Sequence, residues 1–217
     1  MNRSLRAPLF LTSGLVAIAT LAGAIAFAQE SKPSKPQDAS SPPPGMSEAD
    51  MKACMEAATP GTNHQKLLDK AGTWTGDQQM WSGSDATTPA TSPTTWTMTS
   101  LLDGRYLKTE VTGDMPGMGP YHGAGVAGYD NVSKQFVADW IDNMGTGIMQ
   151  GAGELSSDGK MLTWKYTFNC PITKKQQVMR EIQKFNSADA MTVEFFCTDP
   201  KTGKDYKCMQ AELKKSR

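Results

Sequence analysis

From Trp74 to the C-terminus, the sequence is a series of short segments in which apolar and polar residues alternate. Successive side chains of a β-strand point to opposite faces, so an alternation with period two predicts strands that bury one face. We predict strands at residues 73–81, 94–101, 105–113, 121–129, 135–142, 147–155, 161–169, 176–185, 190–198 and 205–213.

The connections between these segments are short and rich in turn-forming residues. Asp103-Gly104 and Asp158-Gly159 each separate two segments, and Asp199-Pro200-Lys201-Thr202-Gly203 separates the last two. Connections of hairpin length favour antiparallel neighbours, because parallel strands need long crossovers. A meander of about ten strands leaves exposed edges unless it closes on itself. The sequence therefore predicts an all-β fold, an antiparallel up-and-down β-barrel of about ten strands over residues 72–217.

The N-terminal residues 1–28 have the pattern of a secretory signal peptide. Arg3 and Arg6 precede an apolar run from Leu9 to Ile25, and Ala26-Phe27-Ala28 is a small-x-small cleavage site. The short run and the cleavage site disfavour the alternative, an uncleaved membrane anchor. We expect an exported protein, periplasmic or secreted, with Gln29 as its new N-terminus and no membrane span after signal removal.

A linker and two short helices are predicted between the signal peptide and the barrel. Residues 29–46 are rich in Pro and Ser, which favours a disordered, extended linker. Over residues 47–71, Ser47 is a good N-cap for a first helix. Thr62 is expected to cap a second helix that runs to Lys70 and buries two leucines, Leu67 and Leu68.

The charge balance narrows the class of partner. The chain carries 22 basic and 22 acidic side chains, so it lacks the excess of positive charge that a nucleic-acid-binding protein needs. With nucleic acid excluded, we expect a small-molecule ligand as the partner, because a barrel of about ten strands is wide enough to hold one. The oligomeric state, and whether the barrel is hollow or filled, stay open at this stage.

Several segments, taken in order, resemble a known family. Leu67-Leu68 and Gly72-Thr73-Trp74-Thr75-Gly76 resemble the Gly-x-Trp opening of lipocalin-like barrels. The later segments are Asp103-Gly104-Arg105, Tyr121-His122-Gly123-Ala124-Gly125, Gly128-Tyr129-Asp130-Asn131 and Trp140-Ile141-Asp142-Asn143-Met144-Gly145-Thr146-Gly147. Together they resemble DUF1579, a bacterial domain of unknown function, from about His64 to Arg217. The resemblance implies a lipocalin-like or nitrobindin-like barrel and carries no catalytic residues to transfer. Lipocalins also place a basic residue over the signature Trp, for which the candidates are Lys214, Lys215 and Arg217.

Aromatic and polar residues of the predicted strands form a candidate ligand-binding site. The aromatic candidates are Tyr129, Trp140, Trp164, Tyr166 and Phe195, and the polar candidates are Asp142, Asn143, Arg105 and His122. The stretch Trp140–Gly147 has two interpretations. In one, Asp142 holds a tight turn and Trp140 packs against the barrel. In the other, Asp142, Asn143 and Thr146 anchor a ligand at the barrel mouth.

These candidates favour an exported protein that binds a small apolar or amphipathic ligand, rather than an enzyme. Three alternatives stay open. They are an enzyme with Asp142 or His122 at the barrel mouth, a non-catalytic structural or interaction module of the cell envelope, and haem binding through His122. No spacing typical of a metal site is present, and the sequence identifies neither a ligand nor a cofactor.

Charged and sulfur-containing side chains complete the set of candidates. Arg180 and Glu194 would have to pair if both faced inward, and the alternative is that both face solvent. The even number of cysteines suggests disulfides in an exported protein. In the last predicted hairpin residue 197 faces residue 206, so Cys197 and Cys208 can pair after a small shift of register. Cys170 with Cys197, or Cys170 with Cys54, are the alternative pairings.

Overall fold

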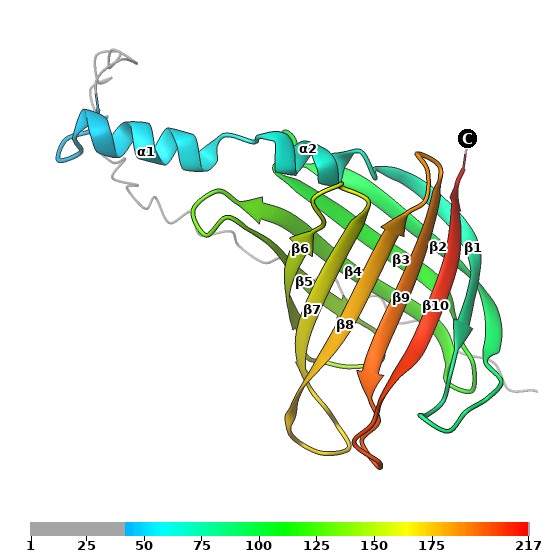
Figure 1. Ribbon diagram of the computed structural model, residues 1–217. Helices are drawn as coiled ribbons and strands as arrows, with labels where there is room; N and C mark the ends of the chain where they lie inside the picture. The colour runs from blue at the N-terminus through cyan, green and yellow to red at the C-terminus, as the bar shows by residue number, and fades with distance from the viewer. Residues whose placement is uncertain (1–41, 217) are drawn as a thin grey trace, which may run out of the picture. The chain divides into compact units, whose positions relative to one another are not determined.

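The computed structural model describes residues 42–216, so the predicted signal peptide and the linker up to Ser41 lie outside the described residues. Two helices precede ten strands (Figure 1). The elements are α1 (Glu48–Ala58), α2 (Thr62–Leu68), β1 (Gly72–Met80), β2 (Ala90–Leu101), β3 (Tyr106–Met115), β4 (Gly119–Asp130), β5 (Gln135–Asp142), β6 (Met149–Leu155), β7 (Met161–Asn169), β8 (Gln176–Phe185), β9 (Ala190–Thr198) and β10 (Asp205–Lys215). None of the described helices is long and apolar enough to cross a membrane.

The strands form one closed antiparallel barrel in chain order. Each strand pairs with its neighbours in sequence, and β1 closes the ring by pairing with β10 from Trp74↔Lys215 to Met80↔Met209. The predicted up-and-down barrel of about ten strands, preceded by two short helices, is confirmed. Because the sheet closes on itself, its strands expose no long edge to solvent.

Strand β2 begins earlier than the sequence pattern predicts. It starts at Ala90 rather than at residue 94, and it includes Pro93, which lies opposite Asp77 of β1. On its other side β2 pairs with β3 only from Thr94 onward. Pro93 therefore lies where β2 has a neighbour on one side alone, and the missing proline N–H leaves no gap in a ladder there.

Helix α1 extends away from the barrel and buries none of its residues (Figure 1). Ser47 is its N-cap, as predicted, and the Ser47 Oγ accepts a hydrogen bond of 3.1 Å from the backbone N–H of Asp50. At its C-terminal end, the side-chain amide of Asn131 donates to the carbonyl oxygens of Ala57 (3.1 Å) and Thr59 (2.8 Å). The turn between β4 and β5 thus anchors the end of α1.

Helix α2 lies over one end of the barrel (Figure 1). Its N-cap is Gly61, so the prediction that Thr62 caps this helix is wrong. The buried His64 holds Gly61 at this position, because its Nδ1 accepts a hydrogen bond of 3.0 Å from the Gly61 N–H, and the helix has no side-chain N-cap hydrogen bond. Leu67 is buried beneath the helix and Leu68 is partly buried, as predicted.

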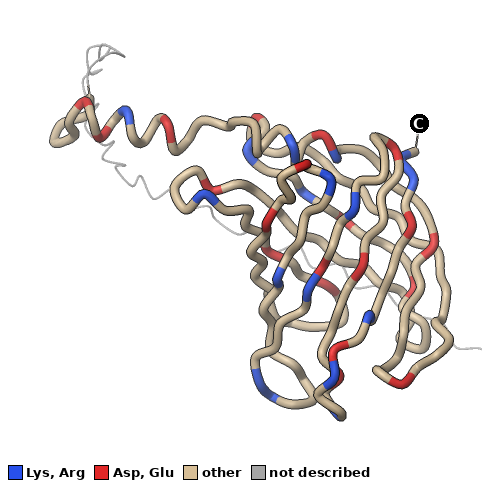
Figure 2. The backbone as a smooth tube through the Cα atoms, viewed as in Figure 1, with Lys and Arg blue, Asp and Glu red and all other residues tan. Residues whose placement is uncertain are grey.

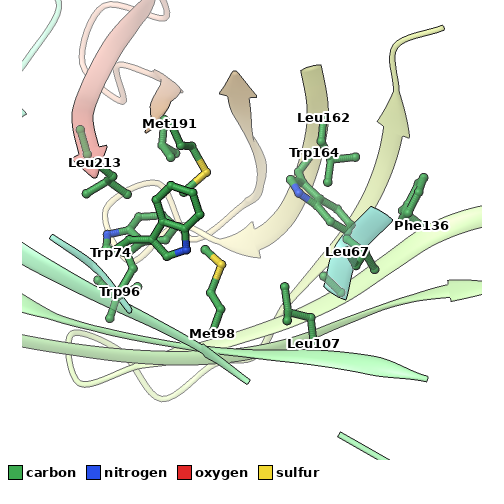
Figure 3. Close-up of a cluster of buried hydrophobic side chains, with 14 of the residues drawn as sticks. Leu67, Trp74, Trp96, Met98, Leu107, Phe136, Leu162, Trp164, Met191 and Leu213 are labelled. Carbon is green, nitrogen blue, oxygen red and sulfur yellow. The ribbon is translucent and has the colours of Figure 1, made fainter. Parts of the chain in front are cut away.

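Large apolar side chains pack together in the barrel interior next to α2. Figure 3 shows Trp74, Trp96, Met98, Met191 and Leu213 in one group, with Leu67, Leu107, Phe136, Leu162 and Trp164 beside it. The Trp74 indole N–H donates to the carbonyl oxygen of Lys70, 2.9 Å away, and so connects β1 to the segment after α2.

Gly72, the glycine of the Gly-x-Trp motif, has a φ of +135°, which side chains other than glycine rarely adopt, and a Cβ there would meet the side chain of Lys215. A Cβ at Gly76, two residues after the tryptophan, would meet the backbone carbonyl oxygen of Glu212 on β10. Only glycine allows β1 and β10 to approach this closely at the seam where the barrel closes. Of the basic candidates near the C-terminus, Lys215 lies over the tryptophan, with its Nζ 5.4 Å from the Trp74 ring centroid, and Arg217 lies outside the described residues.

A disulfide joins Cys197 of β9 to Cys208 of β10, with 5.8 Å between their Cα atoms. The predicted pairing is confirmed, and so is the register on which it depends, because Tyr206 lies opposite Cys197. The predicted shift of register is also present, as an irregularity between Lys207 and Met209 that contains Cys208. Cys54 and Cys170 are free thiols.

Candidate functional site

A cavity of about 1190 Å³ lies inside the barrel. Its lining runs from Leu67 and Lys70 at α2 to the loop of residues 143–148, which follows β5 at the opposite end. Aromatic and sulfur-containing side chains make up much of the wall, including Trp81, Trp140, Trp164, Tyr166, Phe168, Phe195, Met179 and Met209. The barrel is therefore hollow, and the cavity is large enough for a small organic molecule.

Glycines on β6 let aromatic rings of β7 lie flat against the wall. Gly151 pairs with Tyr166 and Gly153 pairs with Trp164. A Cβ at either glycine would come within 2.6 Å of the partner ring. The rings therefore cover the neighbouring strand instead of projecting across the barrel, an arrangement known to compensate for glycine in sheets.

The same wall contains a row of small residues. Ala127 of β4 pairs with Ala138 of β5, which in turn pairs with Gly151 of β6. All three strands therefore present little side-chain volume at this level of the barrel. The space that larger residues would fill here belongs to the cavity, which Ala127 and Ala138 line.

One carboxyl group, that of Glu181 on β8, is buried in this wall. It is 4% exposed and lies between Trp164 of β7 and Phe195 of β9 in the strand register. Gln183 donates a hydrogen bond of 2.7 Å to its Oε1, and within residues 42–216 no cation forms an ion pair with it. Burial raises the pKa of Glu181 to about 7, against the opposing effect of the Gln183 hydrogen bond.

The charged side chains that the strands contribute to the cavity lining are all acidic. Glu181, Asp139 and Asp142 contribute carboxyl groups from the strands, whereas the basic lining residues, Lys66 and Lys70, belong to the α2 region, which also contributes Asp69. The Lys70 Nζ lies 3.6 Å from the ring centroid of Phe185. Along the whole barrel, acidic and basic residues are interspersed (Figure 2). The bias toward acidic groups is thus a property of the cavity lining.

Polar groups near the mouth form a second cluster. The Trp140 indole N–H donates to the Tyr121 hydroxyl oxygen over 3.1 Å, and both side chains line the cavity. Burial, and then the nearby Asp142 carboxylate, raise the pKa of Tyr121 well above its usual range. Asp142 accepts a hydrogen bond of 2.9 Å from the backbone N–H of Met144. Asp142 therefore holds a turn, as in the first interpretation, and its side chain also lines the cavity.

The structure brings together most of the aromatic candidates predicted from the sequence. Trp140, Asp142, Trp164, Tyr166 and Phe195 all line the cavity. Tyr129 is further up the barrel, where its ring packs edge-on against Phe136, 4.9 Å away between centroids. It supports the core beneath α2 rather than the cavity wall.

The remaining polar candidates lie outside the cavity. The Asn143 side chain accepts from the His122 N–H (2.8 Å) and donates to the Pro120 carbonyl (2.9 Å), so it clamps the ends of β4 and β5. Arg105 lies in the turn between β2 and β3, where its guanidinium donates to the Leu102 carbonyl oxygen.

His122 is exposed on the outer face of β4, between Tyr121 and Gly123 on the inner face. An imidazole in this position points away from the cavity. The expectation of haem bound inside the barrel through His122 therefore disagrees with the geometry, and so does a His122 base acting on a molecule in the cavity.

Arg180 and Glu194 do not pair with each other. The Arg180 guanidinium lies 4.2 Å from the Phe196 ring centroid on the exposed face, and Glu194 pairs with Lys184 at 2.6 Å. The inward acid is Glu181, the residue next to Arg180. Charged and apolar residues occur on both faces of β8, so alternation alone could not identify it.

The structure also contains a buried hydrogen-bond network that the sequence did not predict. The Gln78 side chain on β1 donates to the Ser92 hydroxyl (3.1 Å) and to the Asp114 carbonyl oxygen (3.0 Å). Ser92 donates to the same carbonyl oxygen. These polar groups on β1 and β2 are satisfied by one another and by β3, so they stabilise the wall without needing a ligand.

Comparisons with known proteins agree with this architecture. Residues 59–215 match the family described as "Protein of unknown function (DUF1579)". Among solved structures, the chain is similar to Rv2717c from M. tuberculosis, with a TM-score of 0.54 and 13% identity over 73% of this chain and 100% of that one. It is also similar to the S-type phycobiliprotein lyase CPES from Guillardia theta, with a TM-score of 0.52 and 8% identity over 76% and 97% of the two chains. At these identities the likeness shows the fold alone. No curated protein matches the chain.

Proposed function

Since the chain belongs to the DUF1579 family and folds into a hollow barrel, we propose that it binds a small amphipathic molecule inside that barrel. The observation that carries the proposal is the cavity of about 1190 Å³. Ligand sites are typically concave, mostly apolar, and supplied with a few convergent polar groups. Trp140, Trp164 and Tyr166 supply the apolar surface here, and Tyr121 and Glu181 supply polar groups.

The row of small residues gives a direct test of the proposal. An Ala138→Trp variant places an indole into the cavity, whereas Val137→Trp changes the neighbouring residue on the exposed face of β5. We expect the wild-type protein to bind the neutral fluorescent probe N-phenyl-1-naphthylamine with enhanced emission. Ala138→Trp should weaken this binding by about tenfold or more, equivalent to about 1.4 kcal/mol, while Val137→Trp retains the wild-type affinity.

Circular dichroism and thermal unfolding of both variants check that they are folded. Equal loss of probe binding in the two variants would contradict a site inside the barrel. Two negative results together would contradict the proposed function itself. They are no saturable binding of this probe by the wild-type protein, and no co-purified molecule in native mass spectrometry of the protein isolated from its host.

The proposal includes export to an oxidising compartment. The signal-peptide pattern of residues 1–28 supports it, and so does the Cys197–Cys208 disulfide, because structural disulfides persist outside the cytosol. We expect the protein isolated from its host to begin at Gln29, and alkylation without reduction to modify Cys54 and Cys170 alone. Full-length protein in which all four cysteines are alkylated would contradict export.

A further inference from the structure

The cavity contains a carboxyl group that the fold does not require. Strands β7, β8 and β9 would close equally well around an apolar residue at position 181, since the neighbours Trp164 and Phe195 are themselves apolar. Burial of an ionisable group without a charged partner is costly, and proteins usually avoid it. Among the described residues, only the Gln183 side-chain amide donates a hydrogen bond to the Glu181 carboxyl group.

From this arrangement we infer that the ligand is a lipophilic amine, whose protonated nitrogen pairs with Glu181 while its apolar body lies against the aromatic wall. The inference rests on the proposed function and names the chemical class of the ligand. A cation would supply the missing partner of the carboxylate, and an ammonium N–H would donate to it.

Two further observations support a cation rather than a neutral or anionic ligand. The other acidic residues that the strands contribute to the cavity lining, Asp139 and Asp142, add negative charge, and the strands contribute no lysine, arginine or histidine to that lining. An anion would therefore meet carboxyl groups without a compensating positive charge from the barrel wall. The rings of Trp164 and Tyr166, with centroids 6.0 Å apart, also present π-faces that attract cations.

Binding of such an amine should depend on pH through Glu181. The titratable side chains that interact with it are Tyr166 on β7 and Tyr121 on β4, and Asp139 and Asp142 on β5 are the other acids that the strands contribute to the lining. Burial holds the pKa of both tyrosines above the usual range, so they remain neutral when Glu181 ionises. On β9, Phe195 carries no charge and Cys197 is held in the disulfide.

The test uses three probes with the same aromatic body, namely 1-pyrenemethylamine, 1-pyrenemethanol and 1-pyrenecarboxylate. Fluorescence anisotropy with the wild-type protein at pH 8 measures the affinity of each. We expect the amine to bind about tenfold or more tightly than the alcohol, and the carboxylate to bind most weakly. Lowering the pH to 5.5 should protonate Glu181 and remove most of the preference for the amine, while the affinity for the alcohol stays the same.

A Glu181→Gln variant should abolish the preference for the amine while it still binds the alcohol, and that binding shows that the cavity is intact. Glu194→Gln, on the outer face, is the matched control and should behave as wild type. Equal binding of amine and alcohol by the wild-type protein, or a preference for the amine that survives Glu181→Gln, would overturn the inference and leave the proposed cavity function standing. If none of the three probes binds, both proposals are contradicted.

Discussion

We expect the ligand-free Glu181→Gln variant to be more stable than the wild-type protein, by an amount that increases as the pH rises. The pKa of Glu181 is about 7 in the folded protein against a reference value of 4.5. The folded state therefore binds this proton more tightly than the unfolded state does, and the wild-type protein loses stability as the pH rises from about 4.5 to about 7. A shift of this size corresponds to about 3 kcal/mol, and Glu181→Gln removes it.

Urea unfolding of wild type and variant at pH 4, 6 and 8 measures this effect, with the disulfide kept intact. The difference in unfolding free energy should be small at pH 4 and reach its full value at pH 8. Glu194→Gln provides a control of opposite sign, because the Lys184 ion pair lowers the pKa of Glu194 and so stabilises the fold above the reference pKa. A difference between Glu181→Gln and wild type that does not change with pH would show that Glu181 is not desolvated.

Replacing Trp74 by alanine is expected to destabilise the protein by about 4 kcal/mol, the range typical for removal of a buried tryptophan. Trp74 is 1% exposed, its indole N–H donates to the Lys70 carbonyl oxygen, and it belongs to the buried apolar core. The substitution removes core volume and also breaks the link between β1 and the segment after α2. Equilibrium unfolding gives the magnitude, and hydrogen exchange of the α2 amides reports the loss of the link.

Two substitutions separate these contributions. Trp74→Phe keeps an aromatic ring but loses the hydrogen bond, so α2 should exchange faster while most of the stability is retained. Trp81→Ala, at a half-buried tryptophan of the cavity lining, should cost less than Trp74→Ala. A Trp74→Ala protein as stable as Trp81→Ala would contradict the assignment of Trp74 to the core.

The order and direction of the strands could be predicted from the sequence because the connections are short. Hairpin-length turns such as Asp103-Gly104 leave a meander as the simplest topology, and closure follows from the need to cover its edges. The Cys197–Cys208 pairing was accessible for the same reason, since a hairpin turn fixes its own register. The start of β2 could not be predicted, because the sequence does not show that the first residues of β2 lack a second neighbouring strand.

The candidate site could be predicted only in part. Trp164 and Tyr166 follow from alternation on β7, where one face is uniformly apolar. Glu181 does not follow from alternation, because β8 carries apolar residues on its outer face as well, such as the exposed Val178. The orientation of His122 depends on which face of β4 is inside, and a strand with glycine or alanine at so many positions gives no hydrophobic pattern to decide it.

The glycines of β6 determine how much space remains within the sheet. With residues of ordinary size opposite Tyr166 and Trp164, the two rings would turn toward the axis and occupy part of the lumen. Two proteins with the same ten-stranded architecture can therefore differ in whether they bind a ligand. The difference depends on side-chain size at a few positions that have little effect on the backbone. Relatives of this protein can be sorted on this basis, by the residues they carry opposite these two rings, before any of them is purified.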